Sequence, residues 1–507
     1  MNDGKICVSV FAETAEDFMK NIHRAEKSSD VVELRFDLLP ESELENALEK
    51  TCDLTSEKQL LFTFRPREQG GKRDLTRTER EHFWCSGYDF CASWADVEID
   101  MVETVSHWLF KKIICSHHDF STTPANLVEI YENLKATGAD VLKIAVRTND
   151  IADSIALWKL LETAKSENQQ IIPIAMGEAG KWTRILGPAH GAFMTYAALD
   201  AGRETASGQL TAKELVETYR VRELDENTAI YGIIGHPVGH SVSPAMHNAA
   251  FKFHRLNAVY VPFEVKNLGE FVEKFVRPET REIDLNLRGF SVTIPHKRAI
   301  IEYLDEIDET ARIIGAVNTV KIENGRLFGY NTDAQGFIEP LKTAYGDLSG
   351  VKIAVLGAGG AARACVYALK KENASITVFA RDLKKGEALA NEFQVNLKEM
   401  PKTESQKPKT DFHDFDVLIN ATPLGMKGEF ENETPAFAGQ IEKLKLVYDL
   451  IYNPSQTSLM SEADEANVPK IGGLAMLVAQ GMAQQKIWTG LDAPLREMSR
   501  AALEKLS

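Results

Sequence analysis

The chain has 507 residues, 44% of them hydrophobic and 26% charged, which is typical of globular proteins but too long for a single hydrophobic core. The formal net charge of −16 at pH 7 argues against a nucleic-acid partner, although a few arginines in a pocket can still bind an anionic small molecule. No apolar run is long enough to span a bilayer, and a strand-like stretch begins almost at the N-terminus, so we expect several domains, no membrane contact and a cytoplasmic location, with a processed plastid form as the alternative.

The six cysteines are scattered and lack the paired C-x-x-C spacing of a zinc site. We therefore expect reduced thiols and no bound metal. The residues concerned are Cys7, Cys52, Cys85, Cys91, Cys115 and Cys365.

Strand-like runs alternate with amphipathic helix patterns through the first half of the chain. The runs cover residues 6–11, 31–39, 59–65, 94–101, 112–118, 141–147, 170–177 and 191–198. One helix is expected to have Thr123 as its N-cap and Pro124 as its first residue, and to close at Gly138. This alternation predicts a (β/α)8 barrel, in which the active site lies at the carboxyl ends of the strands.

The run 141–147, V-L-K-I-A-V-R, places one lysine in an otherwise apolar strand. A strand that is apolar on both faces belongs to a parallel sheet covered by helices, so Lys143 should point into a packed interior. Desolvation lowers the pKa of a buried amine, which makes it a usable nucleophile for carbonyl substrates. The alternative is a lysine at a strand end whose amine reaches water or pairs with an acid.

Other polar residues gather where strands end. They are Glu33, Arg35, Arg65, His118 and Arg184. On the fifth strand, alternation directs His118, and not His117, toward the barrel mouth. A lone arginine or histidine at such a place is more often a surface or loop residue, but the convergence of these residues on one end of the barrel predicts a site.

The motifs E-L-R-F-D-L-L, F-T-F-R-P-R-E-Q-G-G, C-S-H-H-D-F, V-L-K-I-A-V, M-G-x-x-G-x-x-x-R and T-A-S-G-Q resemble those of type I 3-dehydroquinate dehydratase, over about residues 5–218. The resemblance implies that Lys143 forms a Schiff base with the substrate ketone, while His118 removes the adjacent proton and then protonates the departing hydroxyl. It also implies substrate contacts from Ser9, Glu33, Arg35, Arg65, Arg184, and from Thr205 and Gln209 on a closing loop. Thr205 stands where bacterial members often have serine.

Apolar periodicity is lost over residues 218–228, where we expect a domain junction. After a strand at 229–234 comes G-H-P-V-G-H-S-V-S-P-A-M-H-N, in which Ser243 before Pro244 predicts a helix N-cap with Ser241 beside it. Two hydroxyls and free amides at a helix N-terminus suit a carboxylate, and a plain capped helix is the alternative.

The strand 351–356, the turn G-A-G-G-A-A and a following helix match the dinucleotide fingerprint, with Gly357, Gly359 and Ala362 in G-x-G-x-x-A. The next strand, 375–380, ends at Arg381, where an NAD enzyme usually has an acid. Arginine there predicts recognition of a 2′-phosphate and hence NADP, while the neighbouring Asp382 keeps NAD as the alternative. Residues 398–410 are expected to form a surface loop.

Residues 228–507 resemble shikimate dehydrogenase through G-F-S-V-T-I-P-H-K, G-A-V-N-T, G-Y-N-T-D, N-A-T-P-L-G-M, V-Y-D-L-I-Y-N-P and G-G-L-A-M-L-V-A-Q. The resemblance implies a catalytic pair, Lys297 and Asp333, in which an ammonium held by a carboxylate stabilises or protonates the oxygen of a carbonyl that receives hydride. The implied substrate contacts are Ser241, Ser243, Thr293, Asn318, Tyr452 and Gln480. The implied cofactor contacts are Gly357, Ala358, Gly359, Gly360, Ala361, Ala362, Arg381, Thr422, Met426, Leu450 and Gly473. Two departures are Ser291 for the common asparagine, and Ala380 and Asp382 beside the arginine.

Together the resemblances imply an α/β chain with a (β/α)8 TIM barrel at 1–220, a shikimate-binding domain at 228–340, to which helices at about 472–507 return, and a Rossmann NADP-binding domain at 341–471. We expect the chain to convert 3-dehydroquinate to 3-dehydroshikimate and then, with NADPH, to shikimate, for aromatic amino-acid biosynthesis. Fusion raises the local concentration of the intermediate without establishing a channel. A homo-oligomer is compatible with both resemblances. The alternatives are a catabolic quinate/shikimate dehydrogenase and a non-catalytic metabolite sensor.

Overall fold

A computed structural model describes residues 4–52, 54, 56–85, 93–105, 110–400 and 411–506 of the chain. Cys91 and residues 401–410 of the expected surface loop lie outside the described residues. The chain divides into two compact units, one of Met1–His240 with Asn257–Leu287 and the other of Ser241–Leu256 with Arg288–Ser507.

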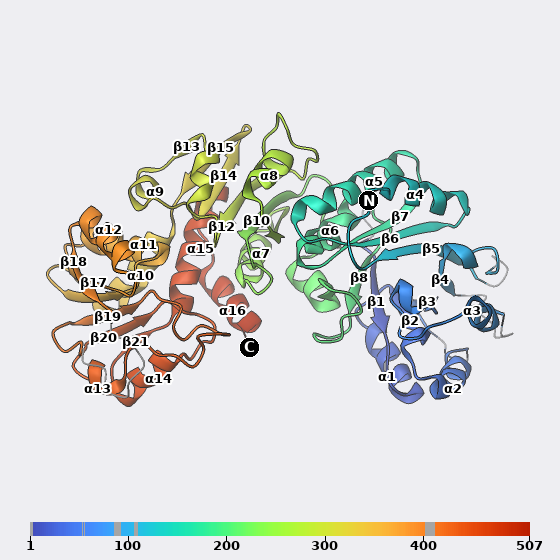
Figure 1. Ribbon diagram of the computed structural model, residues 1–507, viewed down its shortest axis with the longest axis horizontal. Coiled ribbons are helices and arrows are strands. Elements are labelled where there is room, and N and C mark those ends of the chain that lie inside the picture. Colours follow the sequence, from blue (N-terminus) through green and yellow to red (C-terminus); the bar gives the residue numbers. More distant parts are fainter. Residues whose placement is uncertain are drawn as a thin grey trace. The chain divides into compact units, whose positions relative to one another are not determined.

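The first unit is built on a curled parallel sheet, shown in blue to green in Figure 1, with the strand order β7-β6-β5-β4-β3-β2-β1-β8-β9. The Phe193 N–H donates to the Ile171 carbonyl (2.8 Å), which joins the chain entering β8 to β7 and closes the curl. The predicted barrel is therefore confirmed. Its strands are β1 Ile6–Val10, β2 Val31–Arg35, β3 Gln59–Thr63, β4 Trp94–Glu98, β5 Lys112–Asp119, β6 Val141–Arg147, β7 Gln170–Met176, β8 Thr195–Ala198 and β9 Leu210–Thr211.

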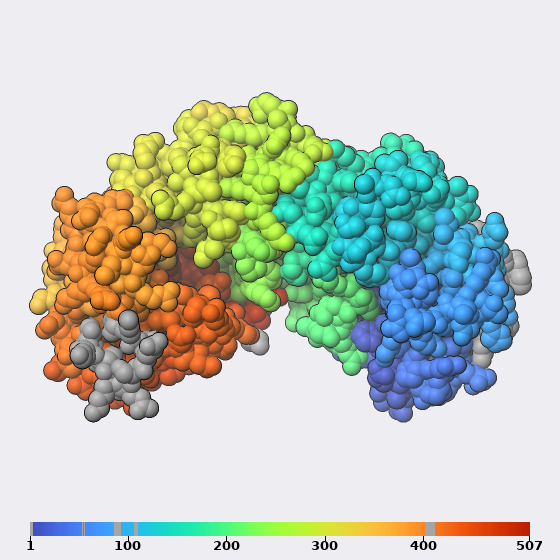
Figure 2. Space-filling model, viewed as in Figure 1, coloured from blue at the N-terminus to red at the C-terminus, as the bar shows by residue number. Residues whose placement is uncertain are grey.

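Helices cover the outside of this sheet (Figure 1). In α1, for example, Phe18, Ile22 and Ala25 are buried at the spacing of one helix face, and the Thr14 hydroxyl caps the helix by accepting the Asp17 N–H (3.2 Å). Figure 2 shows the outer surface of this region, blue to cyan, as closely packed side chains. The helices are α1 Ala15–Glu26, α2 Glu41–Cys52, α3 Arg77–Trp84, α4 Leu127–Ala136, α5 Ile155–Ser166 and α6 Lys181–Leu186.

Strand alternation sorts the inside of the barrel into layers. One buried apolar cluster contains Cys7, Val31, Leu61, Trp94, Ile114 and Val141. Side chains two residues further along each strand point the same way, nearer the carboxyl end. These next residues are all polar: Ser9, Glu33, Thr63, Asp96, Ser116 and Lys143. The apolar layer thus supports a polar layer at the end of the barrel where the site was predicted.

Several predicted boundaries are wrong. Helix α4 begins at Leu127 after Asn126, not at Pro124, and the Thr123 hydroxyl donates to the Arg147 carbonyl (2.8 Å). Strands β2 and β4 end at Arg35 and Glu98, before the predicted ends of their runs. Each is followed by a short 3-10 turn, Phe36–Leu38 and Ile99–Met101, whose apolar residues had extended the strand pattern.

Residues 219–228 contain no helix or strand in the structure, which describes this stretch in full. They lead to the parallel pair of β10 Ala229–Gly235 and β11 Ala258–Glu264, followed by α8 Leu268–Phe271. These elements belong to the first compact unit.

The second unit contains a mixed sheet with associated helices. Strand β14 pairs antiparallel with β12 and β15, and β13 pairs parallel with β15. The elements are α7 Ser243–Phe253, β12 Leu287–Val292, β13 Glu306–Ile307, α9 Glu309–Ile314, β14 Thr319–Glu323, β15 Arg326–Tyr330, α10 Asp333–Tyr345, α15 Gly473–Thr489 and α16 Leu495–Leu506.

A parallel sheet of order β18-β17-β16-β19-β20-β21 forms the rest of the unit. Ile353 and Val355 of β16 join one buried apolar cluster, and Ala354 and Leu356 join another, so both sheet faces are covered, as expected of a Rossmann fold. Helices α11 and α12 lie on one face, and α13 and α14 on the other (Figure 1). The elements are β16 Lys352–Leu356, α11 Gly360–Lys371, β17 Ser375–Ala380, α12 Leu383–Phe393, β18 Asn396–Glu399, β19 Val417–Asn420, α13 Ala438–Ile441, β20 Leu446–Asp449, α14 Ser458–Glu465 and β21 Lys470–Ile471. Lys398 and Glu399, predicted to start a loop, therefore lie in a strand.

Candidate active sites

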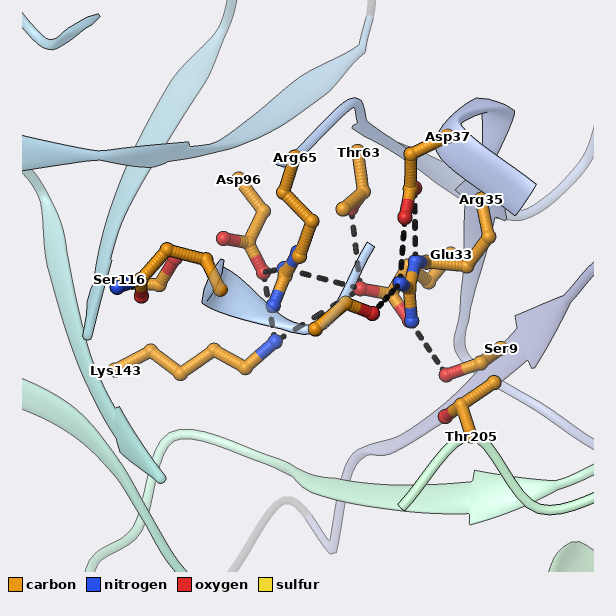
Figure 3. Close-up of polar contacts among 12 residues, drawn as sticks. Ser9, Glu33, Arg35, Asp37, Thr63, Arg65, Asp96, Ser116, Lys143 and Thr205 are labelled. Atoms are coloured by element: carbon orange, nitrogen blue, oxygen red, sulfur yellow. Dashed lines mark hydrogen bonds and ion pairs between the residues drawn. The ribbon is translucent and has the colours of Figure 1, made fainter. Parts of the chain in front are cut away.

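A cavity opens at the carboxyl ends of the barrel strands. Its lining includes these predicted residues: Glu33, Arg35, Arg65, His118, Lys143, Arg184, Thr205 and Gln209. It also includes Gln69 and Tyr196, which the sequence analysis did not single out. In Figure 3, Lys143, Arg65 and Asp96 point toward one another, with Glu33 and Arg35 beside them. The predicted convergence of side chains from separate strands is therefore present in the structure.

The Lys143 amine is both buried and ion-paired. The residue is 3% exposed, and its Nζ lies 2.7 Å from Asp96 Oδ2 and 3.8 Å from Glu33 Oε1. Arg65 Nη2 shares the same carboxylates, 2.7 Å from Asp96 Oδ2 and 3.7 Å from Glu33 Oε1. Lys143 therefore lies in the packed interior, as predicted, and it also pairs with an acid, as the alternative interpretation of this lysine expected.

Burial lowers the pKa of Lys143, and Asp96 opposes this while Arg65 reinforces it. Burial alone would raise the pKa of Asp96, but the charges of Arg65 and Lys143 outweigh burial and lower it to about 2. Asp96 therefore stays ionised and can receive a proton from Lys143 only transiently. The pair holds an amine that loses its proton more easily than an exposed lysine does.

His118 contacts Arg65 and Gln69. Its Nε2 lies 2.5 Å from Arg65 Nη1, its backbone N–H donates to Gln69 Oε1 (3.0 Å), and its Nδ1 lies 3.4 Å from the same oxygen. Burial lowers the pKa of His118 well below its usual range, and the Arg65 and Lys143 charges add to the shift. The imidazole is therefore neutral near pH 7 and can accept a proton. An N–H on Nδ1 facing Gln69 would leave Nε2 as the accepting nitrogen.

Ser9 lies behind Glu33 and does not line the cavity. Its hydroxyl donates to Glu33 Oε2 (2.5 Å), and the Thr63 hydroxyl donates to Glu33 Oε1 (3.0 Å). These bonds fix the carboxylate, whose pKa is lowered because Lys143, Arg35 and Arg65 outweigh the opposite effect of burial. Direct contact between Ser9 and substrate stays a prediction.

Arg184 is buried, and two of its guanidinium nitrogens are unpaired in the described part of the chain. It is 2% exposed, and its Nε and Nη2 have no hydrogen-bond partner among the described residues. Burial lowers its pKa to about 10. A buried guanidinium without a partner is costly, so an anion is expected to fill this position.

The loop 205–209 packs over the cavity. The Thr205 N–H and hydroxyl both donate to Gln209 Oε1, at 2.8 and 3.2 Å. Gly208 has a φ of +76°, and a Cβ there would lie 2.2 Å from the Gly177 carbonyl oxygen, so this close approach requires glycine. The local chain therefore keeps both predicted side chains on the cavity wall.

Three residues of this site were not predicted from the sequence, each for a different reason. Asp96 lies in the middle of the strand W-A-D-V-E, where an inward carboxylate is as unusual as Lys143, so the same alternation argument could have found it. Tyr196 lies in β8, where an aromatic residue is an ordinary core residue, and it gives no signal in the sequence. Gln69 lies in the motif F-T-F-R-P-R-E-Q-G-G and lines the cavity, but it was not predicted as a site residue.

A second polar cluster forms in the other unit. Lys297 Nζ lies 2.6 Å from Asp333 Oδ2, and Asn318 Nδ2 donates to Asp333 Oδ1 (2.7 Å) and approaches Gln480 Oε1 at 3.5 Å. Lys297 follows β12, Asn318 precedes β14, Asp333 begins α10 and Gln480 belongs to α15. The fold thus brings together four predicted residues from separate elements.

The remaining predicted substrate contacts lie at element ends. Helix α7 begins at Ser243 itself, so the prediction of Ser243 as N-cap is wrong; the Ser241 hydroxyl instead accepts the Ser243 N–H (3.2 Å). Tyr452 packs on the cluster that contains Val242 of this helix start. Thr293 is half-buried between β12 and Lys297. Their contact with substrate stays a prediction.

Ser291 takes part in a buried hydrogen-bond network. Its hydroxyl donates to Gln484 Oε1 (2.9 Å), and Gln484 Nε2 donates to the Asn318 carbonyl (3.2 Å) and the Thr319 hydroxyl (3.0 Å). The serine that replaces the common asparagine is therefore connected to the backbone of a predicted site residue. Gln484, on the long helix α15, gave no signal in the sequence.

A cavity of about 610 Å³ lies beside the glycine-rich turn of the Rossmann sheet. Gly357, Ala358, Gly359, Arg381 and Thr422 line it. Gly357 has a φ of +109°, and a Cβ there would lie 2.9 Å from the Ala421 carbonyl oxygen, whereas a Cβ on Gly359 would meet nothing within 4 Å. The turn therefore leaves room for a phosphate against the N-terminus of α11, and the residues fit a dinucleotide.

Several other predicted cofactor residues are not part of the lining of this cavity. Gly360, Ala361 and Ala362 form the first turn of α11. Gly473 touches Leu450, since a Cβ on Gly473 would lie 2.1 Å from the Leu450 carbonyl oxygen. Met426 is 46% exposed and is not part of the lining. The Asp382 carboxylate accepts the Lys385 N–H (3.2 Å) and so caps α12, which gives this acid a structural use beside Arg381.

Within the described ranges, no helix combines the length and apolar character needed to cross a bilayer. The same ranges contain no group of three or more His, Cys, Asp or Glu side chains placed to hold a metal ion. Cys7, Cys85, Cys115 and Cys365 are free thiols in the described part of the chain.

Family models match successive parts of the chain. Residues 6–226 match type I 3-dehydroquinase, and residues 233–320 match the shikimate dehydrogenase substrate binding domain. Residues 339–426 match shikimate / quinate 5-dehydrogenase, and residues 473–503 match the shikimate 5′-dehydrogenase C-terminal domain.

Known proteins give the same assignment. A bifunctional 3-dehydroquinate dehydratase/shikimate dehydrogenase of Arabidopsis thaliana, named as chloroplastic, is 34% identical over 97% of this chain and 83% of its own length. An NADP+ shikimate dehydrogenase of Methanocaldococcus jannaschii is 43% identical over 56% of this chain and 99% of its own. A shikimate dehydrogenase solved with NADP+ has a TM-score of 0.50 at 41% identity, over 56% of this chain and 98% of its own. The matches favour neither the catabolic dehydrogenase nor the sensor. The chain belongs to the family of bifunctional enzymes that join a 3-dehydroquinate dehydratase to a shikimate dehydrogenase.

Proposed function

We propose that the barrel dehydrates 3-dehydroquinate through a Schiff base on Lys143 and that the second unit reduces the product, 3-dehydroshikimate, to shikimate with NADPH. The observation that carries the proposal is the buried Lys143 amine, 2.7 Å from Asp96, in a cavity that also presents His118 and Arg184. The cavity lining has four cationic side chains, Arg35, Arg65, Lys143 and Arg184, and one carboxylate, Glu33, with Asp96 paired to Lys143 and Arg65 beside it, which suits an anionic substrate.

In the dehydration, the neutral Lys143 amine adds to the substrate ketone, and loss of water leaves a protonated imine. The positive nitrogen withdraws electrons and acidifies the neighbouring carbon, so neutral His118 can remove its proton. The electron pair left on that carbon then expels the hydroxyl, which leaves as water after His118 returns the proton. A second water hydrolyses the imine, which frees 3-dehydroshikimate and restores the amine.

Substrate binding follows from the remaining groups in the cavity. The unpaired donors of Arg184 would hold the carboxylate by charge-assisted hydrogen bonds. Glu33, Arg35 and Arg65 would bind the ring hydroxyls and fix the ketone near Lys143, while Thr205 and Gln209 would cover the bound substrate. Ser9 would support Glu33 through the 2.5 Å hydrogen bond.

In the reduction, Lys297 would protonate the carbonyl oxygen as hydride reaches the carbon, and Asp333, 2.6 Å away, would hold the ammonium in place. NADPH supplies the hydride when bound. Asn318 and Gln480 would orient the substrate, together with Ser241, Ser243, Thr293 and Tyr452. The glycine turn and the start of α11 would hold the pyrophosphate, Arg381 the 2′-phosphate, and Thr422, Met426, Leu450 and Gly473 the nicotinamide side.

Under this proposal, each domain of the chain has one function. Residues 1–220 would form the dehydratase, residues 228–340 with the helices of about 472–507 the shikimate-binding domain, and residues 341–471 the NADP-binding domain. The family models, whose matches run over 6–226, 233–320, 339–426 and 473–503, support this division.

Borohydride trapping tests the proposal. We expect borohydride and 3-dehydroquinate to leave a reduced adduct on the peptide that contains Lys143, detected by mass analysis, and the untrapped sample to oxidise NADPH. A Lys143→Met chain should lose the adduct and the dehydration but still reduce added 3-dehydroshikimate, and a Lys297→Met chain should do the reverse. Binding of 3-dehydroquinate without an adduct on Lys143 would refute the first assignment, and no oxidation of NADPH with added 3-dehydroshikimate would refute the second.

A further inference from the structure

Tyr196 contacts the reactive nitrogen of the dehydratase site with its ring face. The side chain comes from β8, is 4% exposed and lines the same cavity as Lys143. Lys143 Nζ lies 4.0 Å from the centroid of the ring. In the sheet register, Tyr196 is the neighbour of Cys7 on β1, and both residues belong to the inward apolar cluster. The ring is therefore held firmly by the barrel core.

The surroundings of the nitrogen combine charges of both signs. The charged and titratable groups that act on it are Asp96 of β4, Glu33 of β2, Arg65 after β3, His118 of β5 and Cys7 of β1. Two carboxylates attract the ammonium, and the arginine repels it. The face of an aromatic ring adds attraction for a cation without bearing a charge itself.

We propose that the aromatic face of Tyr196 stabilises positive charge on the Lys143 nitrogen, and that this stabilisation persists when the ammonium becomes the iminium of the covalent intermediate. The inference rests on the proposed Schiff base. An ammonium has three N–H donors for carboxylates, whereas a protonated imine has one, so the carboxylates lose hydrogen bonds as the imine forms. The attraction to the ring depends on charge and needs no N–H, so it persists.

The hydroxyl of Tyr196 makes no comparable contact. It is buried, and none of the described residues offers it a hydrogen-bond partner. Burial raises the pKa of Tyr196 well above its usual range, so the ring is a neutral phenol and not a phenolate. The geometry therefore assigns the effect to the ring face, which phenylalanine would also provide.

Substitutions at Tyr196 separate the ring from the hydroxyl. Tyr196→Phe keeps the face, while Tyr196→Leu and Tyr196→Met remove it with similar bulk. Tyr131→Leu removes a buried ring from the outer helix α4 and is the matched control. The rate of borohydride trapping by 3-dehydroquinate is followed against pH, together with kcat for dehydration. Reduction of 3-dehydroshikimate by the same chain reports that the protein is active outside the barrel, and far-ultraviolet circular dichroism reports that the barrel is folded.

Because attraction to the ring raises the pKa of Lys143, its loss should move the trapping profile to lower pH. The leucine and methionine chains should also lose about tenfold in kcat, since the iminium is less stable. The phenylalanine chain should keep the wild-type profile and lose much less kcat. Tyr131→Leu should leave the profile in place.

Two results would overturn the inference. One is a leucine or methionine chain, folded by circular dichroism, with the trapping profile and kcat of the phenylalanine chain. The other is a phenylalanine chain that loses as much as the leucine chain, which would assign the effect to the hydroxyl. If the wild-type protein forms no adduct on Lys143, the proposed Schiff base itself is wrong. That result is distinguishable from a failure of the inference about Tyr196, in which the wild-type adduct forms.

Discussion

Two acids on one strand have opposite ionisation behaviour because of their immediate neighbours. Asp96 and Glu98 are both buried and two residues apart on β4. Asp96 lies between Arg65 and Lys143, and its pKa falls to about 2. Glu98 has one oxygen 3.1 Å from Arg80, but its Oε1 is buried without a partner in the described part of the chain, and burial raises its pKa to about 7. Strand position fixes where these carboxyls lie, and the contacts fix their charge.

We predict that Glu98 makes the barrel less stable as pH rises from about 4.5 to about 7. Its folded pKa lies above the ordinary value of 4.5, so the folded chain binds the extra proton in this window and its stabilising effect is lost as pH rises through the folded pKa. Glu98→Gln, which is neutral at every pH, removes this dependence. The difference in unfolding free energy between wild type and variant should change by up to about 3 kcal/mol across the window, in favour of the variant at high pH.

Chemical denaturation at a series of pH values, followed by tryptophan fluorescence, measures the effect. Glu132→Gln removes an exposed carboxylate from α4 and is the control, for which the difference from wild type should be small and nearly constant. If Glu98→Gln and wild type lose stability in parallel between pH 5 and 8, the carboxyl is ionised in the folded chain and the prediction fails.

At the scale of elements, regular patterns gave accurate strands where polar residues bounded them. The predicted bounds 141–147 and 375–380 coincide with β6 and β17. The start of α4 was missed as well: Thr123 and Pro124 have the local pattern of a helix start, but the Thr123 hydroxyl contacts the Arg147 carbonyl of β6 and the helix begins only at Leu127. The ends of β2 and β4 were missed because apolar 3-10 turns continue the strand composition. Errors therefore occur where a tertiary contact or a turn replaces a local signal.

The same distinction applies to the sites. Lys143 and His118 could be predicted because alternation and strand ends determine which way they point. The partnership of Asp96 with both Lys143 and Arg65 depends on the packing of three strands and is visible only in the fold. Gln484 connects Ser291 to Asn318 across elements far apart in sequence, and no periodicity marks it. Individual site residues could therefore be predicted from the sequence, but most of their hydrogen-bond and ion-pair partners could not.

The turn between β17 and α12 determines cofactor preference in our proposal. Arg381 and Lys385 line the cavity there, and Asp382 caps the helix. We predict that Arg381→Gln raises the KM for NADPH by about 10- to 100-fold, the size of a lost charge-assisted hydrogen bond, and leaves the KM for NADH nearly unchanged. Initial rates with both cofactors at saturating 3-dehydroshikimate measure this. Asp382→Asn, which retains a capping oxygen but removes the negative charge, should lower the KM for NADPH. Equal losses for both cofactors in Arg381→Gln would contradict a 2′-phosphate contact.

At the scale of the whole molecule, the substrate residues proposed for the two reactions lie in different compact units. All proposed dehydratase residues lie within Met1–His240, and all proposed dehydrogenase substrate residues lie within Ser241–Leu256 or Arg288–Ser507. The proposed shikimate-binding domain, 228–340, crosses this division, because β10 and β11 belong to the first unit. The covalent link between units raises the concentration of one site near the other, but it does not by itself keep a small anionic intermediate from diffusing away.

We therefore predict that the intermediate exchanges with solvent. The test uses an equimolar mixture of Lys143→Met and Lys297→Met chains, each defective in one reaction. The mixture is compared with a wild-type sample that contains the same number of working dehydratase and dehydrogenase sites. Both samples should form shikimate from 3-dehydroquinate and NADPH at the same steady-state rate. Both reactions then draw on one bulk pool of 3-dehydroshikimate, whose steady-state level depends on the two activities and not on the linkage between chains. The lag before steady state, followed by NADPH absorbance, should also be the same. The contrary result is a lag that is much shorter for wild type than for the mixture. If that short lag also stays unchanged when an excess of a separate enzyme that consumes 3-dehydroshikimate is added, the intermediate is transferred directly and the prediction fails.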